Sequence, residues 1–99
     1  MILEVANLNV IQGKTAEFES NFKIAAKIIS TMKGYRGHEL QKCIEAADKY
    51  VLLVSWDSLE DHTVGFRQSE EYEEWKKLLH HFYDPFPTVE HFELVDKYK

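Results

Sequence analysis

Apolar residues recur along this chain with two kinds of spacing, and the first kind predicts four strands. Nearly continuous apolar runs over Ile2–Ile11 and Tyr50–Val54 indicate strands that are covered on both faces. The segment Tyr35–Glu45 is more polar, which is typical of a strand at a sheet edge. A further segment, Thr88–Val95, is predicted to be the last strand.

The second kind of spacing is helical and predicts two helical regions, of which the later one is in two pieces. The first helix is expected to begin at Thr15, whose hydroxyl can cap it, and to end just before Gly34. Ser58 begins a short helix, Ser69 caps the next one, and Asp84–Pro87 ends it. Each long helix carries one apolar stripe: Phe18, Phe22, Ala25, Ile29 and Met32 on the first, and Tyr72, Trp75, Leu79 and Phe82 on the last.

The element order is therefore β-α-β-β-α-β, which predicts an α+β fold of the ferredoxin-like type with an antiparallel four-stranded sheet. The first and third strands of such a sheet are central, and the two most apolar segments occupy these places. The 99 residues are expected to form one domain, residues 1–99. Because 44% of the residues in so small a body are hydrophobic, we expect a second subunit to cover some of them in a homodimer.

Charge and composition exclude several classes of partner. The net charge is −5, and acidic and basic residues are interspersed, so no nucleic-acid partner is expected. No apolar run approaches the length that spans a membrane, so no membrane partner is expected either. Met1 leads straight into a strand-like segment without a signal-like region, which predicts a cytoplasmic protein. Cys43 is the only cysteine and is interpreted as a small hydrophobic residue.

The stretch from Trp56 to His91 holds four of the five histidines, and motifs in and around it carry a resemblance. In order and spacing, these motifs resemble those of the antibiotic biosynthesis monooxygenase family, a group of dimeric α+β barrel proteins. The motifs are Ala6-x-Leu8-x-Val10-x-x-Gly13, Val54-x-Trp56-x-Ser58-x-Glu60-x-His62, Gly65-Phe66-Arg67-x-Ser69-x-x-Tyr72-x-x-Trp75-x-x-Leu78 and Pro87-x-Val89-x-His91.

The resemblance implies two sheets packed face to face across a dimer, with a pocket between helices and sheet in each subunit. Characterised members of the family oxygenate activated aromatic or polyketide-like substrates without metal or flavin, so no cofactor is expected here. Another branch of the family degrades haem. Counted from the serine that opens the last helix, the axial histidine of that branch falls at Lys76, and Phe66 occupies the place of its tryptophan. The haem-degrading role is therefore not favoured.

An oxygenase without a cofactor needs a base, donors for a developing oxyanion and a dry aromatic pocket. His62 is the candidate base or hydrogen-bond donor, because Phe66 shares its helix face four residues later. His91, on an apolar strand face, and Asn7, in a central strand, are candidates for positioning the oxyanion. The structural alternatives are a half-exposed His62, a hydrogen-bonded His91 in the core or dimer interface, and an Asn7 hydrogen-bonded across strands or at the dimer interface.

Four aromatic residues are candidates for the pocket wall, although helical spacing alone makes them core residues: Phe66, Tyr72, Trp75 and Phe82. His80 is expected on the solvated face of its helix, and His81 nearer the sheet. No metal is expected, because the histidines show no ligand spacing motif.

Two functions from different classes follow. The leading hypothesis is a cofactor-independent monooxygenase that acts on a small aromatic or quinol-like substrate. The alternative is a non-catalytic, dimeric binding or stress-related protein that holds a small aromatic or apolar ligand in the same pocket. A third possibility is a purely structural dimer whose own aromatic side chains fill the pocket.

Overall fold

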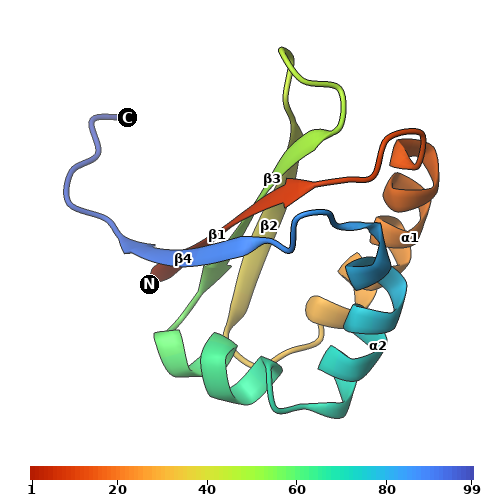
Figure 1. The fold of residues 1–99 in the computed structure, drawn as a ribbon. Coiled ribbons are helices and arrows are strands. Elements are labelled where there is room, and N and C mark those ends of the chain that lie inside the picture. The colour runs from red at the N-terminus through yellow and green to blue at the C-terminus, as the bar shows by residue number, and fades with distance from the viewer.

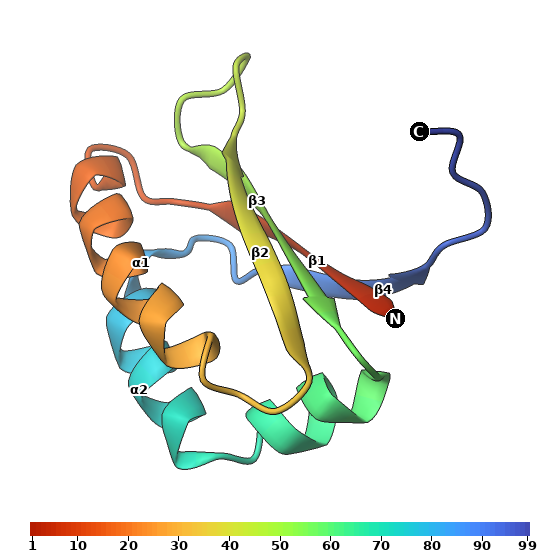
Figure 2. The same ribbon diagram turned by 180° about the vertical axis from the view of Figure 1, so that it is seen from behind.

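The computed structural model describes all residues from Met1 to Lys99 and shows one antiparallel sheet with two long helices side by side on one face (Figures 1 and 2). The sheet order is β2-β3-β1-β4, so the predicted ferredoxin-like α+β fold is confirmed. No helix is both long enough and apolar enough to cross a membrane. The elements are β1 (Ile2–Asn9), α1 (Thr15–Ile29), β2 (Tyr35–Lys42), β3 (Lys49–Trp56), the helical turn η1 (Asp61–Phe66), α2 (Glu70–Leu79), the 3₁₀ turn η2 (His80–Phe82) and β4 (Thr88–Glu93).

Strand β1 organises the sheet because it pairs with β3 on one side and with β4 on the other. Ala6 lies opposite Leu52 of β3 and opposite Val89 of β4. Since side chains alternate along a strand, the even-numbered residues of β1 face the helices. The prediction that β1 and β3 are the central strands is confirmed.

The core lies between this face of the sheet and the stripe of α1. Phe18, Phe22 and Ala25 of α1 are buried, as the helical spacing predicts. The ring of Phe18 contacts that of Tyr50 on β3 at a centroid distance of 5.0 Å. Trp56, at the end of β3, is fully buried and is one of the largest side chains in the core. Burial of these rings is the main driving force for the fold.

Several element boundaries differ from those expected. Helix α1 ends at Ile29, short of the expected stop before Gly34, and turns continue to Gly34. Thr15 is the first helical residue rather than the cap, because Lys14 occupies the N-cap position. Strand β1 ends at Asn9 instead of Ile11, since the Val10 N–H donates to the carbonyl of Asp48.

The strands β2, β3 and β4 also differ slightly in extent. Strand β2 ends at Lys42 and β4 at Glu93, before the expected Glu45 and Val95, while β3 extends on both sides of the expected Tyr50–Val54. The chain beyond β4 extends away from the helices in both ribbon views (Figures 1 and 2). The cap at Ser69 is as expected, because its Oγ accepts the Tyr72 N–H at 3.1 Å.

Within a single chain, the helices cover only one face of the sheet. The apolar runs of the first and third strands predict that both faces are covered. The odd-numbered residues of β1 and β3 point away from the helices and stay partly exposed. This open face carries an apolar patch made of Leu3, Val5, Val51, Leu53 and Phe92. A second copy of the chain remains the predicted cover.

We predict that light scattering of the purified protein gives twice the 11.7 kDa mass of one chain. Leu53→Glu places a charge within the open face and should give a monomer, because the charge would have to be desolvated in the interface. Ile24→Glu is the control, since Ile24 is an exposed apolar residue on α1. A wild-type mass of one chain at micromolar concentration would contradict the dimer.

Gly34 permits the close approach of η1 to the start of β2. Its φ is +84°, and a Cβ atom there would collide with the carboxylate of Asp61, the first residue of η1. Gly13 has nearly the same φ, +83°, but a Cβ atom there would meet nothing within 4 Å. The two glycines thus share the backbone requirement and differ in crowding.

We predict that Gly34→Ala lowers the free energy of unfolding more than Gly13→Ala does. Each variant loses about 1–3 kcal/mol from a left-handed backbone without glycine, and Gly34→Ala loses more because η1 must shift. Urea unfolding at equal protein concentration measures both. Equal losses would mean that Asp61 moves aside freely.

Candidate functional site

A cavity of about 410 Å³ opens between the helix-covered face of the sheet, η1, α2 and the segment that follows α2. Its floor is formed by β1 and β3, which contribute Ala6, Leu8 and Leu52. Four lining residues carry titratable or charged groups beyond tyrosine: Glu4, His62, Arg67 and His80. The cavity is large enough for a small aromatic molecule.

One wall of the cavity is aromatic. Phe66 meets Tyr72 at 5.1 Å and Trp75 at 5.6 Å between ring centroids, in edge-to-face contacts. These three predicted wall residues therefore do line the cavity, together with Tyr83 and Phe86.

Phe82 does not line it, contrary to the sequence prediction. It is buried in the core and packs against Phe18 of α1 at 5.8 Å between centroids. The reason is that α2 ends at Leu79, and the 3₁₀ turn η2 changes the direction of the side chains that follow.

The same turn exchanges the expected places of the two neighbouring histidines. His80 lines the cavity, and its ring contacts Phe86 at 5.0 Å and Tyr72 at 6.0 Å between centroids. His81 is exposed. The expectation of a solvated His80 and an inward His81 is therefore wrong.

His62 is held at the inner end of the cavity by an unusual turn. The Arg67 N–H donates to the His62 carbonyl, five residues back, so η1 has the wide turn of a π-helix. Such turns are frequent at functional sites. The His62 side chain is only 3% exposed, and its ring stacks on that of Trp56 at 5.3 Å. The alternative of a half-exposed helical histidine is excluded.

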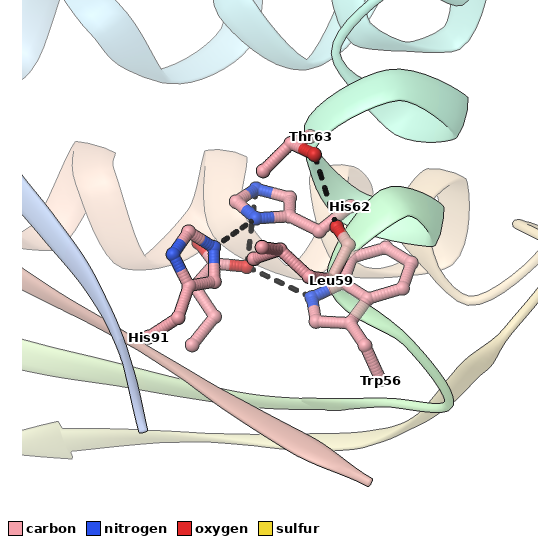
Figure 3. Close-up of polar contacts among 6 residues, drawn as sticks. Trp56, Leu59, His62, Thr63 and His91 are labelled. Atoms are coloured by element: carbon pink, nitrogen blue, oxygen red, sulfur yellow. Dashed lines mark hydrogen bonds and ion pairs between the residues drawn. The ribbon is translucent and has the colours of Figure 1, made fainter. Parts of the chain in front are cut away.

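A polar network that is buried except at the half-buried His91 connects β1, β3, β4 and η1 (Figure 3). The Trp56 Nε1–H donates to Glu4 Oε1 at 3.0 Å, and His62 Nε2 lies 3.3 Å from the same oxygen. On the other side of its ring, His62 Nδ1 lies 2.8 Å from His91 Nε2. Both ring nitrogens of His62 are thus engaged within the protein.

Burial shifts the titration of this network toward neutral groups. It raises the pKa of Glu4, against the opposing effects of the Trp56 hydrogen bond and the charge of Arg67. The pKa of His62 is lowered to about 3, chiefly by burial and then by the charges of Arg67 and His91. The pKa of His91 is lowered by burial and then by Arg67.

The donor and acceptor roles follow from these directions. A neutral imidazole has one N–H donor and one acceptor nitrogen, and an ionised carboxylate only accepts. With Glu4 ionised, the tautomers that suit all three groups direct the His62 Nε2–H at Glu4 Oε1, 3.3 Å away, and let His62 Nδ1 accept the Nε2–H of His91. Every buried polar side-chain atom in the chain has a hydrogen-bond partner.

Asn7 does not belong to this cavity, contrary to the sequence prediction. It lies between Ala6 and Leu8 on β1, and strand alternation turns it to the open face of the sheet. Its register partners are Val51 and Thr88. The residue that sequence reasoning missed is Glu4, although a signal existed: a charged residue in the same strand alternation as apolar Ala6 and Leu8.

Comparison with known proteins places this site in a family context. The family model described as "Antibiotic biosynthesis monooxygenase" matches residues 1–78. The uncharacterised protein YczJ of Bacillus subtilis (strain 168) is 60% identical over 95 residues, which are 96% of this chain and all of YczJ.

Several solved structures are similar to this chain. A Bordetella bronchiseptica protein proposed to be an antibiotic biosynthesis monooxygenase is 35% identical, with a TM-score of 0.91 over 95% of this chain and 96% of its own. SnoaB of Streptomyces nogalater, described as a cofactor-independent oxygenase, is 22% identical with a TM-score of 0.70 over 99% of this chain and 94% of its own. The likeness to SnoaB shows the fold alone.

We predict that stability falls as the pH drops below about 6.5, because the unfolded chain binds a proton at His62 that the folded chain excludes. Between pH 7 and pH 5 the His62 contribution falls by about 2 kcal/mol. Glu4 acts in the opposite direction, since its raised pKa favours the folded state as the pH falls. Urea unfolding of the wild type and of His62→Gln at both pH values isolates the His62 effect. An equal fall in both proteins would show that His62 titrates normally in the fold.

Proposed function

The chain belongs to the antibiotic biosynthesis monooxygenase family, and on this premise we propose that it is a cofactor-independent monooxygenase for a small aromatic or quinol-like substrate. The observation that supports this most is the pairing of an aromatic wall with buried Glu4 and His62 at one cavity, while the half-buried His91 contacts His62 and does not line the cavity. An apolar cavity with a few convergent polar groups of shifted pKa is typical of an active site.

The proposed reaction uses molecular oxygen and balances without a cofactor. An acidic CH₂ group of the substrate loses a proton to a base and keeps the electron pair as a carbanion. The carbanion reduces O₂ and combines with it to give a peroxide, which takes a proton back. Loss of water then gives a ketone, so that R₂CH₂ and O₂ become R₂C=O and H₂O. The protein must therefore supply proton transfer and stabilisation of an oxyanion.

Two cavity residues suit the stabilising role. Arg67 is exposed, lines the cavity and carries a permanent positive charge, which favours a phenolate or enolate oxygen near it. His80 is half-buried in the cavity beside Phe86, and burial lowers its pKa, so that its neutral ring can donate an N–H. The aromatic wall supplies stacking and excludes water.

Haem degradation is not favoured by the residues present. Lys76, at the position where the resemblance to the haem-degrading branch would require an axial histidine, forms an ion pair with Glu73 at 3.1 Å. The protonated amine of a lysine in such a pair has no free electron pair for iron.

The alternative, a non-catalytic small-ligand-binding protein, is favoured by one observation. Both nitrogens of His62 face groups of the protein, Nδ1 in a hydrogen bond with His91 and Nε2 at 3.3 Å from Glu4, so neither is directed at a substrate proton. In either case, we propose a homodimeric, cytoplasmic protein.

Oxygen uptake separates the two functions. We predict that metal-stripped protein consumes oxygen with an anthrone, hydroquinone or catechol in a manner that saturates with substrate, and that His62→Ala lowers the rate at least tenfold. His81→Ala is the matched control, because His81 is exposed. Saturable quenching of tryptophan fluorescence by these compounds, without uptake above a protein-free control, would favour the binding protein.

A further inference from the structure

We infer that Glu4 is the catalytic base of this site, and that His62 and His91 are positioning residues that hold its carboxylate for proton transfer. This inference rests on the proposed function and names the residue that carries out its first step. It differs from the sequence prediction, in which His62 was the candidate base.

The two oxygens of Glu4 have different surroundings. Oε1 accepts the N–H of Trp56 and faces Nε2 of His62, whereas Oε2 has no hydrogen-bond partner within the chain. No fully buried polar side-chain atom lacks a partner, so Oε2 keeps access to the space around it. Glu4 itself is only 6% exposed, and it lines the cavity. The accessible oxygen therefore faces the cavity.

His62 cannot take the substrate proton in this arrangement. Its Nε2 is directed to Glu4 at 3.3 Å and its Nδ1 to His91 at 2.8 Å. A base needs a lone pair within hydrogen-bond reach of the proton that it accepts. His91 does not line the cavity, so among the groups of the network only Glu4 Oε2 offers one to it.

His91 fixes which nitrogen of His62 carries the proton. Glu4 and His91 are direct register partners on β1 and β4, and their side chains share the helix-covered face. When His91 donates Nε2–H to His62 Nδ1, the single proton of His62 must sit on Nε2, toward Glu4. The strand pairing thus keeps an N–H donor directed at the carboxylate.

The charged and polar groups around Glu4 set its basicity. Trp56 of β3, His62 of η1 and His91 of β4 surround it, and Arg67 after η1 acts on it through its charge. Burial outweighs these groups and raises the pKa of Glu4. A carboxylate with a raised pKa is a stronger base than an exposed one, and the Trp56 N–H and the Arg67 charge oppose that rise.

The proton step is simple. The substrate C–H or O–H bond breaks, the proton passes to Glu4 Oε2, and the electron pair stays on the substrate as a carbanion or phenolate. The neutral carboxylic acid then returns this proton to the peroxide that forms with O₂. Glu4 ends the cycle ionised, and no other reductant or oxidant is needed.

The kinetic test compares three variants on a substrate that the wild type oxygenates. Glu4→Gln keeps the size and the acceptor oxygen but is not a base, so kcat/KM should fall at least 100-fold. Glu74→Gln, which removes the same charge from the exposed surface of α2, is the control and should keep wild-type activity. Activity of Glu4→Gln within about threefold of wild type would overturn the inference and leave the proposed function intact.

The pH profile tests the positioning role. His62→Leu removes the N–H donor, so the acid limb of kcat/KM should move to higher pH, whereas His62→Gln, whose amide can donate, should move it less. An acid limb that is unchanged in His62→Leu would overturn the positioning role of His62. Loss of the limb in Glu4→Gln would identify its carboxylate.

A readout without turnover separates failure of the inference from failure of the proposed function. With ¹³C-carboxyl-labelled glutamate, the NMR resonance missing from Glu4→Gln belongs to Glu4. Its titration midpoint should lie above the ordinary 4.5 and rise further in His62→Leu. A midpoint at or below 4.5 would overturn the inference. No oxygen uptake by wild type with any compound would overturn the proposed function, and the titration would still decide whether Glu4 takes up protons in the cavity.

Discussion

The structure depends on one constraint: a carboxylate on the buried face of a central strand must find hydrogen-bond donors. Burying an unpaired carboxylate costs many kcal/mol, so Glu4 is compatible with this fold only if its neighbours supply N–H groups. Trp56 supplies one from β3, and Nε2 of His62 on η1 lies 3.3 Å from the same oxygen. The π-turn of η1 and the close approach that Gly34 allows bring His62 within reach. The π-turn of η1 and the glycine at position 34 thus both help to place His62 beside the buried carboxylate of Glu4.

The same arrangement creates the cavity. The network fills the end of the sheet where β1, β3 and β4 meet η1, while α2 and the segment after it stand further along the sheet and leave a gap. Phe66 belongs to both parts, because it follows His62 in η1 and forms the aromatic wall with Tyr72 and Trp75. A ligand in the gap would therefore contact an aromatic surface and the carboxylate of Glu4 at once.

Much of the fold was predictable from the sequence, because hydrophobic periodicity directly reports which face of an element is buried. The site was less predictable. His62 and the wall from Phe66 to Trp75 were identified, but Asn7 was chosen where Glu4 was the inward residue. The apolar run predicted cover on both faces of β1 and so did not distinguish its odd from its even positions. Only this distinction shows that Glu4 points toward the helices and Asn7 away from them. The places of His80 and Phe82 depend on a 3₁₀ turn after α2, and helical spacing assumes that no such turn occurs.

Burial of Glu4 both lowers the stability of the fold and raises the pKa of this carboxyl group, which makes it a stronger base. An apolar side chain of similar volume at this position would leave no charge to desolvate, and replacements of this kind often stabilise proteins. The chain instead keeps a carboxylate whose pKa burial raises, two histidines whose pKa values burial lowers, and one carboxyl oxygen open to an aromatic cavity. Burial thus favours the neutral form of the carboxyl group and of both imidazole rings, which are typical shifts at a functional site. A fold that only needed a core would gain nothing from this arrangement, whereas a site that must remove a proton from an apolar substrate requires it.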